Sequence, residues 1–491
     1  MSIRRTDFLY LAAGIGLAAI GVMVAVNPNA RVSLYVLAGV LGVLLAVAII
    51  LKPVLGANVL IIAIFTNISD LLTKQGGPSV IKPLAILVAG AILVHYATTR
   101  QLPAGRSKTS TIELFIFLYF IIMAASYLVA RDKDVASAAI LDFAKDIVII
   151  YSIQFALRES GEWKQAVWVI MGVTAALCTL ELYQSLTGNY SQMFFGLAST
   201  RQDQVVGQST ASRLGGPINA PNMWGQVLVA VVPFALYRVF YDKSKLAKLV
   251  ALLFLGLMLF VIFNTYSRGA YLALGIVLFL IVLDLRVNPM LAIGAVAIMV
   301  IAILVLPGEY TARFETLTSL SPTAENGIYQ DSSIRGRSSE MLTGLAMFEQ
   351  HPLLGLGAAN YKPSYQQYAQ LIGIETRAEP RDAHSLYIQV LAETGILGFV
   401  AFMGLMISLL GALSAARKDV KDNPAFASWL PWLTASRLSI VAYLTTSIFL
   451  HNAYIRYFWI LAAMAITAIQ LTQQMVVNDL PRRIKSGSSL S

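Results

Sequence analysis

The run Leu249-Val-Ala-Leu-Leu-Phe-Leu-Gly-Leu-Met-Leu-Phe-Val-Ile-Phe263 contains no charged or hydrogen-bonding side chain. With its flanking residues it forms an apolar stretch over 247–266. A helix needs about 20 mostly apolar residues to cross roughly 30 Å of hydrocarbon. The stretch is therefore predicted to be a membrane-spanning helix.

Similar apolar stretches recur along the whole chain, and the third, sixth and tenth of them are short or carry polar residues. The fourteen candidates are 8–26, 33–51, 54–72, 80–97, 112–130, 138–157, 165–186, 222–241, 247–266, 270–284, 290–306, 385–413, 430–450 and 453–474. They predict an all-α fold, a polytopic transmembrane bundle of about 12–14 helices.

The composition supports a membrane protein. Of the 491 residues, 57% are hydrophobic and only 13% are charged, whereas a soluble domain carries about 25% charged residues. The net charge of +10 does not indicate nucleic-acid binding, because the basic residues cluster beside apolar runs. The single cysteine, Cys178, lies in an apolar run, which excludes a disulfide framework and a cysteine metal site.

The basic residues also predict the orientation. If the chain starts inside, the inner loops hold about twice as many Lys and Arg residues as the short outer loops. Both termini are then cytoplasmic, which agrees with an even number of helices. Met1-Ser-Ile-Arg-Arg5 precedes the first apolar run, but no small-residue cleavage site follows it, so the first helix is expected to be retained.

This topology divides the chain into six parts. They are N-terminal transmembrane helices (1–186), a periplasmic loop (187–221), central transmembrane helices (222–306), a large periplasmic loop (307–384), C-terminal transmembrane helices (385–474) and a disordered cytoplasmic tail (475–491). Long loops in compact proteins are usually functional, so the chemistry is expected in the two outer loops. The larger loop contains an amphipathic stretch, 336–350, whose residues Met341, Leu342, Leu345 and Phe348 share one helical face.

Outward arginines form the first candidate site. Arg213 precedes Asn222 in a Gly- and Pro-rich segment, Arg201 lies twelve residues before it, and Arg268 opens a helix after a short turn. A guanidinium group donates in a fixed fork that matches phosphate oxygens. Each arginine alone is also compatible with an interfacial side chain that reaches water.

Histidines form the second candidate site. His384 stands where a late helix begins, and a neutral imidazole can accept a proton near neutral pH. Capping the helix is the alternative role. His451 lies on the same side, and Glu393 lies nine residues beyond His384, where it supports either His384 or another helix. His351, before a proline at the end of the amphipathic stretch, is expected to be structural.

The four histidines lack metal-ligand spacing, so neither a metal site nor a cofactor is expected. Asp142 and Lys145 lie three residues apart and are predicted to pair on one helix face. Glu181 is a further ionisable residue inside an apolar run. Such residues are candidates for function, and pairing with a neighbour is the alternative.

One set of residues resembles a known family. His384-Ser385, nine residues, Gly395, two residues and Gly398 are similar to the histidine motif of the O-antigen ligase family. Arg268 and Leu272 resemble the family's Arg-x3-Leu element, and Arg213 with Pro221-Asn222 resembles its earlier arginine segment. The resemblance covers roughly residues 200–460, including 351–361 in the large loop.

The resemblance implies a metal-independent, inverting glycosyltransferase at the periplasmic face of the bacterial inner (cytoplasmic) membrane. The donor would be an undecaprenyl-diphosphate-linked glycan and the acceptor lipid A-core or a similar glycan or lipid. His384 would be the general base, and Arg213, Arg268 and Arg201 would hold the diphosphate, supported by Asn222, Glu393 and His451.

Two alternatives stay open. An O-antigen or exopolysaccharide polymerase would use the same donor with a second lipid-linked glycan as acceptor. A flippase or secondary transporter belongs to another class, and it should show repeats and polar residues near the membrane midplane. Here the distinctive residues lie in outer loops instead.

Overall fold

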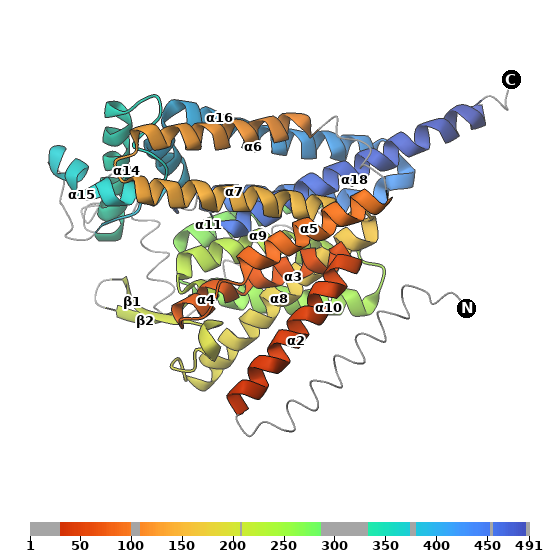
Figure 1. The fold of residues 1–491 in the computed structure, drawn as a ribbon, viewed down its shortest axis with the longest axis horizontal. Coiled ribbons are helices and arrows are strands. Elements are labelled where there is room, and N and C mark those ends of the chain that lie inside the picture. The colour runs from red at the N-terminus through yellow and green to blue at the C-terminus, as the bar shows by residue number, and fades with distance from the viewer. Residues whose placement is uncertain are drawn as a thin grey trace.

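A computed structural model describes residues 30–99, 109–206, 209–285, 332–373, 380–451 and 455–487 of the chain (Figure 1). The elements are α2 (Ala30–Leu51), α3 (Pro53–Phe65), α4 (Ile68–Lys74), α5 (Ile81–Thr99), α6 (Ser110–Ser126), α7 (Lys133–Ala156), α8 (Ser160–Thr187), β1 (Thr200–Val206), β2 (Ser209–Leu214), α9 (Pro221–Tyr241), α10 (Lys245–Asn264), α11 (Arg268–Leu285), α14 (Ser332–Gln350), α15 (Tyr361–Leu371), α16 (Leu386–Lys421), α17 (Leu430–Thr446) and α18 (Arg456–Gly487). Short 3₁₀ turns, at Tyr127–Val129, Phe194–Gly196, Gly216–Ile218 and Pro424–Trp429, connect some of them.

The predicted all-α transmembrane bundle is confirmed. Within the described residues, seven helices are long and apolar enough to cross a membrane, or eight if α3 and α4 form one bent span. Helices α9 and α18 are mostly buried in the bundle, whereas α5, α6 and α10 turn large apolar side chains outward. Ile86, Phe117 and Leu253 are such side chains, and hydrocarbon is the medium that suits them. The predicted runs 8–26 and 290–306 lie outside the described residues.

Two expectations were wrong. The run 54–72 is not one straight helix, because Asn67 adopts a left-handed conformation (φ +51°) between α3 and α4, which are bent by 55°. Residues 475–487, expected to be a disordered tail, continue α18 to Gly487.

A cap covers one end of the bundle. Helices α14 and α15 and the hairpin β1–β2 lie at this end of the long axis, and α18 ends at the other (Figure 1). We call the two ends the α14 end and the opposite end. The cap has a small core of its own, which includes Met347, Tyr361, Tyr365 and Tyr368. The loop was thus predicted correctly to be partly helical.

The details of this cap differ from the sequence analysis. The helix at 336–350 exists as part of α14, but Leu342 is 51% exposed and Leu345 is also exposed. The buried face instead carries Glu340, Thr343 and Met347, because these residues face α15 and the start of α16. The antiparallel hairpin β1–β2 was not predicted at all.

The first half of α16 is joined to the loop before it. At Gly395 the helix breaks (φ +63°, ψ −167°), a conformation that essentially only glycine adopts. The loop backbone fills the gap: Leu356 N donates to Ala392 O (2.9 Å), Gly357 N to Glu393 O (3.0 Å), and Ile396 N to Pro352 O (2.8 Å). A Cβ atom at Gly395 would lie 2.3 Å from Leu353 O, so the loop requires glycine here. These contacts explain the first glycine of the histidine motif.

Candidate active site

His384 lies directly before α16 at the α14 end of the bundle. Its backbone is left-handed (φ +45°), a conformation uncommon for residues other than glycine that often marks functional positions. The backbone N–H of Leu386 donates to Ser447 O at 2.9 Å. This bond fixes the start of α16 against the end of α17, which in turn carries the segment with His451.

His384 belongs to a group of four side chains that form two pairs, His384 with Glu340 and His451 with Asp382. Its Nε2 lies 3.6 Å from Oε2 of Glu340, a residue of α14 that is 2% exposed. The His451 ring meets the His384 ring edge to face, with centroids 5.1 Å apart. His451 Nε2 is 3.3 Å from Oδ2 of Asp382, which also accepts a bond from Lys362 (3.1 Å). Each imidazole therefore faces a carboxylate.

The surroundings keep His384 neutral. Burial lowers the pKa of His384 most, the neighbouring His451 and Arg337 lower it further, and Asp382 opposes the shift, so that the pKa is about 3. Burial also lowers the pKa of His451. At neutral pH both imidazoles carry a lone pair. The Nδ1 atoms of both rings are buried without a hydrogen-bond partner among the described residues.

Arg213 is buried at the end of β2. Its Nε donates to Thr265 O (2.9 Å), and a terminal nitrogen donates to Oδ1 of Asn222 (2.7 Å). Arg201 is exposed and pairs with Arg213 in the register of the hairpin. Arg213 and Asn222, the two ends of the arginine segment, are therefore in direct contact. The guanidinium of Arg213 is held inside the protein, whereas that of Arg201 reaches the surface.

Arg268 begins α11 and is half-buried. The neighbouring Gly269 packs on Phe449, whose Cβ lies 3.5 Å from the position of a Cβ on this glycine. Phe449 stands two residues before His451. Gln226 of α9 donates to Ser447 Oγ (2.8 Å), so α9, α11 and α16 all contact the 447–451 segment. This segment brings the arginines and the histidines to one end of the bundle.

Two buried glutamates support this arrangement. Glu393 Oε1 accepts from Tyr361 N and from Gln389 Nε2, both at 3.3 Å, so it fixes the start of α15. Glu181 accepts from Gly216 N (2.9 Å) and from Trp224 Nε1 (2.7 Å). It thereby holds the turn that follows Arg213. His351 Nε2 lies 2.9 Å from Tyr368 Oη, a contact within the cap that fits the structural role expected of it.

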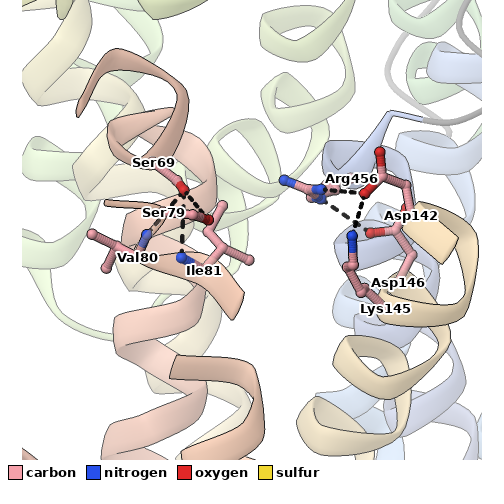
Figure 2. Close-up of polar contacts among 8 residues, drawn as sticks. All are labelled: Ser69, Ser79, Val80, Ile81, Asp142, Lys145, Asp146 and Arg456. Carbon is pink, nitrogen blue, oxygen red and sulfur yellow. Dashed lines mark hydrogen bonds and ion pairs between the residues drawn. The ribbon is translucent and has the colours of Figure 1, made fainter. Parts of the chain in front are cut away.

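A separate ion cluster lies beside this end (Figure 2). Lys145 donates to Asp142 at 2.8 Å, which confirms the predicted pairing, and Arg456 lies 3.5 Å from Asp142 and 3.3 Å from Asp146. Across a cleft of about 420 Å³, Ser69 bonds to Ser79 and to the backbone at the start of α5. Because Arg456 opens α18, the cluster joins the start of α18 to α7.

Residues 225–403 match the model of the O-antigen ligase family. The predicted resemblance to the O-antigen ligases is confirmed. The match supports a membrane glycan transferase of the ligase or polymerase type. It contains Arg268, Glu340, His384 and the two motif glycines, and it is narrower than the expected 200–460. No curated protein matches the chain.

Sequence reasoning missed Glu340 and Asp382, the two carboxylates that face the histidines. Glu340 lies on the opposite face of the helix from the apolar residues of the 336–350 stretch. The apolar pattern therefore predicted the wrong buried face and did not indicate Glu340. The sequence does contain a signal, because Glu340, Thr343 and Met347 recur at helical spacing. These three residues form the buried face of α14. Asp382 stands two residues before His384, where only the fold could show that it faces His451.

Proposed function

We propose that the protein transfers a glycan from an undecaprenyl-diphosphate carrier to lipid A-core or a similar acceptor, on the periplasmic side of the bacterial inner membrane. The observation that carries this proposal is the O-antigen ligase match, which spans His384 and its glycine motif. The neutral, half-buried imidazole of His384 beside a carboxylate supports a transfer in which this imidazole acts as the base.

His384 would act as the general base. If the Nε2–H of His384 points at the Glu340 carboxylate, the lone pair remains on Nδ1. When the acceptor binds, the imidazole of His384 takes the proton of its hydroxyl group, and the hydroxyl oxygen forms a bond to the anomeric carbon. The bond between that carbon and the diphosphate breaks, and its electron pair leaves with undecaprenyl diphosphate. Attack from the opposite face inverts the configuration. Glu340 would stabilise the imidazolium that forms.

The arginines would bind the leaving group. A diphosphate needs no general acid, but its charge must be stabilised as it departs. We assign this role to Arg268 and Arg213, with Arg201 at the exposed rim of the hairpin. Arg213 is already oriented by Thr265 and Asn222, so little side-chain entropy would be lost when phosphate oxygens bind. The polyprenyl tail would lie along the apolar faces of the helices.

The product distinguishes this function from its closest alternative. The full-length protein would be reconstituted in liposomes with EDTA, a lipid-diphosphate-linked glycan and lipid A-core. We expect the glycan on lipid A-core with inverted anomeric configuration, detected by mass spectrometry and NMR. Glycan lengthening on the carrier would instead establish a polymerase. Absence of any transfer, with the protein intact and folded, would contradict both.

The pH dependence tests the environment of His384. Burial and neighbouring positive charge hold the pKa of His384 near 3. His384 therefore stays neutral at pH values far below about 6.5, the ordinary pKa of a histidine. We expect the acidic limb of the kcat/KM profile, which reports the free protein, to lie well below pH 6.5. Arg337→Gln removes a charge that lowers this pKa, so it should move the limb upward. A wild-type limb at pH 6.5, unmoved in Arg337→Gln, would contradict the assignment.

A further inference from the structure

A second polar cleft lies at the opposite end of the bundle from His384. It is formed where α9, α11 and α16 end and α17 begins, and its volume is about 740 Å³. Small-molecule sites typically measure about 300–1,000 Å³. On the proposed orientation this end faces the cytoplasm. None of its residues takes part in the proposed transfer.

The cleft is strongly basic. Among the described residues that line it, Arg238, Lys243, Arg417, Lys418 and Lys421 are cationic and only Asp284 is acidic. Basic pockets between transmembrane helices on the cytoplasmic side suit phosphate-bearing headgroups. The charge of the lining therefore indicates an anionic ligand.

Part of the lining is rigidly built. Asp284 accepts from Tyr237 (2.7 Å) and forms an ion pair with Arg417, whose Nε donates to Thr434 (2.8 Å). Arg238 lies over the Trp432 ring, 3.2 Å from its centroid, and 3.6 Å from Asp242. These two arginines thus have carboxylates of their own.

The three lysines contribute charge beyond those two pairs. Lys243, Lys418 and Lys421 are exposed around the cleft. Because they come from the end of α9 and the end of α16, a ligand between them would contact both helices. Three mobile ammonium groups around a fixed floor suit a phosphate group, which accepts hydrogen bonds from several directions.

The rim of the cleft is apolar and faces outward. Leu283 is 58% exposed and Tyr241 is 49% exposed, with Tyr241 stacked on Tyr237 at 5.8 Å. Tyrosine with one polar and one apolar end is typical of the membrane interface. A soluble anion would bind only the basic part of the cleft, whereas a lipid would place its phosphate among the lysines and its acyl chains beside Leu283.

We propose that this cleft binds the phosphate-bearing headgroup of an anionic phospholipid in the inner leaflet. The bound lipid would bridge α9 and α16. The site goes beyond the proposed transfer, because it lies at the other end of these two helices and uses none of the same side chains.

The test compares lysine variants of the full-length protein. Lys243→Gln/Lys418→Gln/Lys421→Gln removes the exposed charges of the cleft without touching its buried floor. In native mass spectrometry with phosphatidylglycerol, we expect binding to weaken roughly 100-fold, about fivefold for each lysine near an anionic headgroup. Phosphatidylcholine should bind weakly to both proteins.

The matched control, Lys74→Gln/Lys133→Gln/Lys245→Gln, removes the same charge from exposed positions outside the cleft and should keep wild-type binding. Equal loss in both variants would mean unspecific attraction and overturn the proposal. Pyrophosphate that binds the wild-type cleft while phosphatidylglycerol does not would assign it to a soluble anion instead. Unchanged phosphatidylglycerol binding in the cleft variant would also refute the site.

Discussion

His384→Ala is expected to lower the turnover of glycan transfer by about 10²–10⁴-fold, the usual contribution of a positioned general base. The imidazole lies at the helix start, held near Glu340 and His451, and alanine can neither accept the acceptor proton nor use Glu340. Donor binding should change little, because the arginines remain. The measurement is single-turnover transfer in liposomes, with the donor KM determined separately.

The matched control is His351→Ala. His351 lies in the same cap and contacts Tyr368, so this variant loses a histidine near the membrane surface without touching the site. It should retain transfer within a few-fold of wild type. If His384→Ala, folded like the wild type, kept comparable turnover, the assignment of His384 as the base would fail.

Gly395→Ala is expected to destabilise the protein by at least about 3 kcal/mol, the upper range for a residue forced into a conformation that only glycine adopts. The added Cβ would also meet the backbone of Leu353 and Leu354. The loop 352–357 would have to leave α16, and its backbone hydrogen bonds would be lost. Thermal unfolding in detergent should show a large fall in Tm.

Gly411→Ala provides the comparison in the same helix. Gly411 has helical geometry, and a Cβ at this position has no neighbour within 4 Å. Alanine there should be neutral or stabilise the helix by about 0.5–1 kcal/mol. Equal Tm values for the two variants would show that the break in α16 is not a requirement of the fold.

Apolar length could be recognised from the sequence, because the membrane requires it of every spanning helix whatever its neighbours. Helices such as α10 and α18 were found in this way. The bend at Asn67 was missed, since two short apolar helices and one long helix have the same hydropathy. The β1–β2 hairpin was missed because residues 200–214 are polar and carry no strand alternation.

Only some residues of the candidate site could be predicted from the sequence. His384 could be found from its spacing to Gly395 and Gly398, a spacing that the packing of the loop on α16 explains. Glu340 could not, because its importance depends on which face of α14 is buried. The position of Arg213 inside the protein, bonded to Thr265, depends on contacts between residues about fifty positions apart, and no local pattern encodes these.

Glu181 has a consequence for the boundaries of the functional unit. This buried carboxylate belongs to α8 and holds the turn at Gly216 and the indole of Trp224, all upstream of the family match. Arg213, directly before that turn, donates to Thr265 inside the match. A fragment excised at residues 225–403 would leave behind both Glu181 and the arginine hairpin. Chimaeras that exchange residues 225–403 between related membrane transferases should therefore exchange α8 and the hairpin together with them.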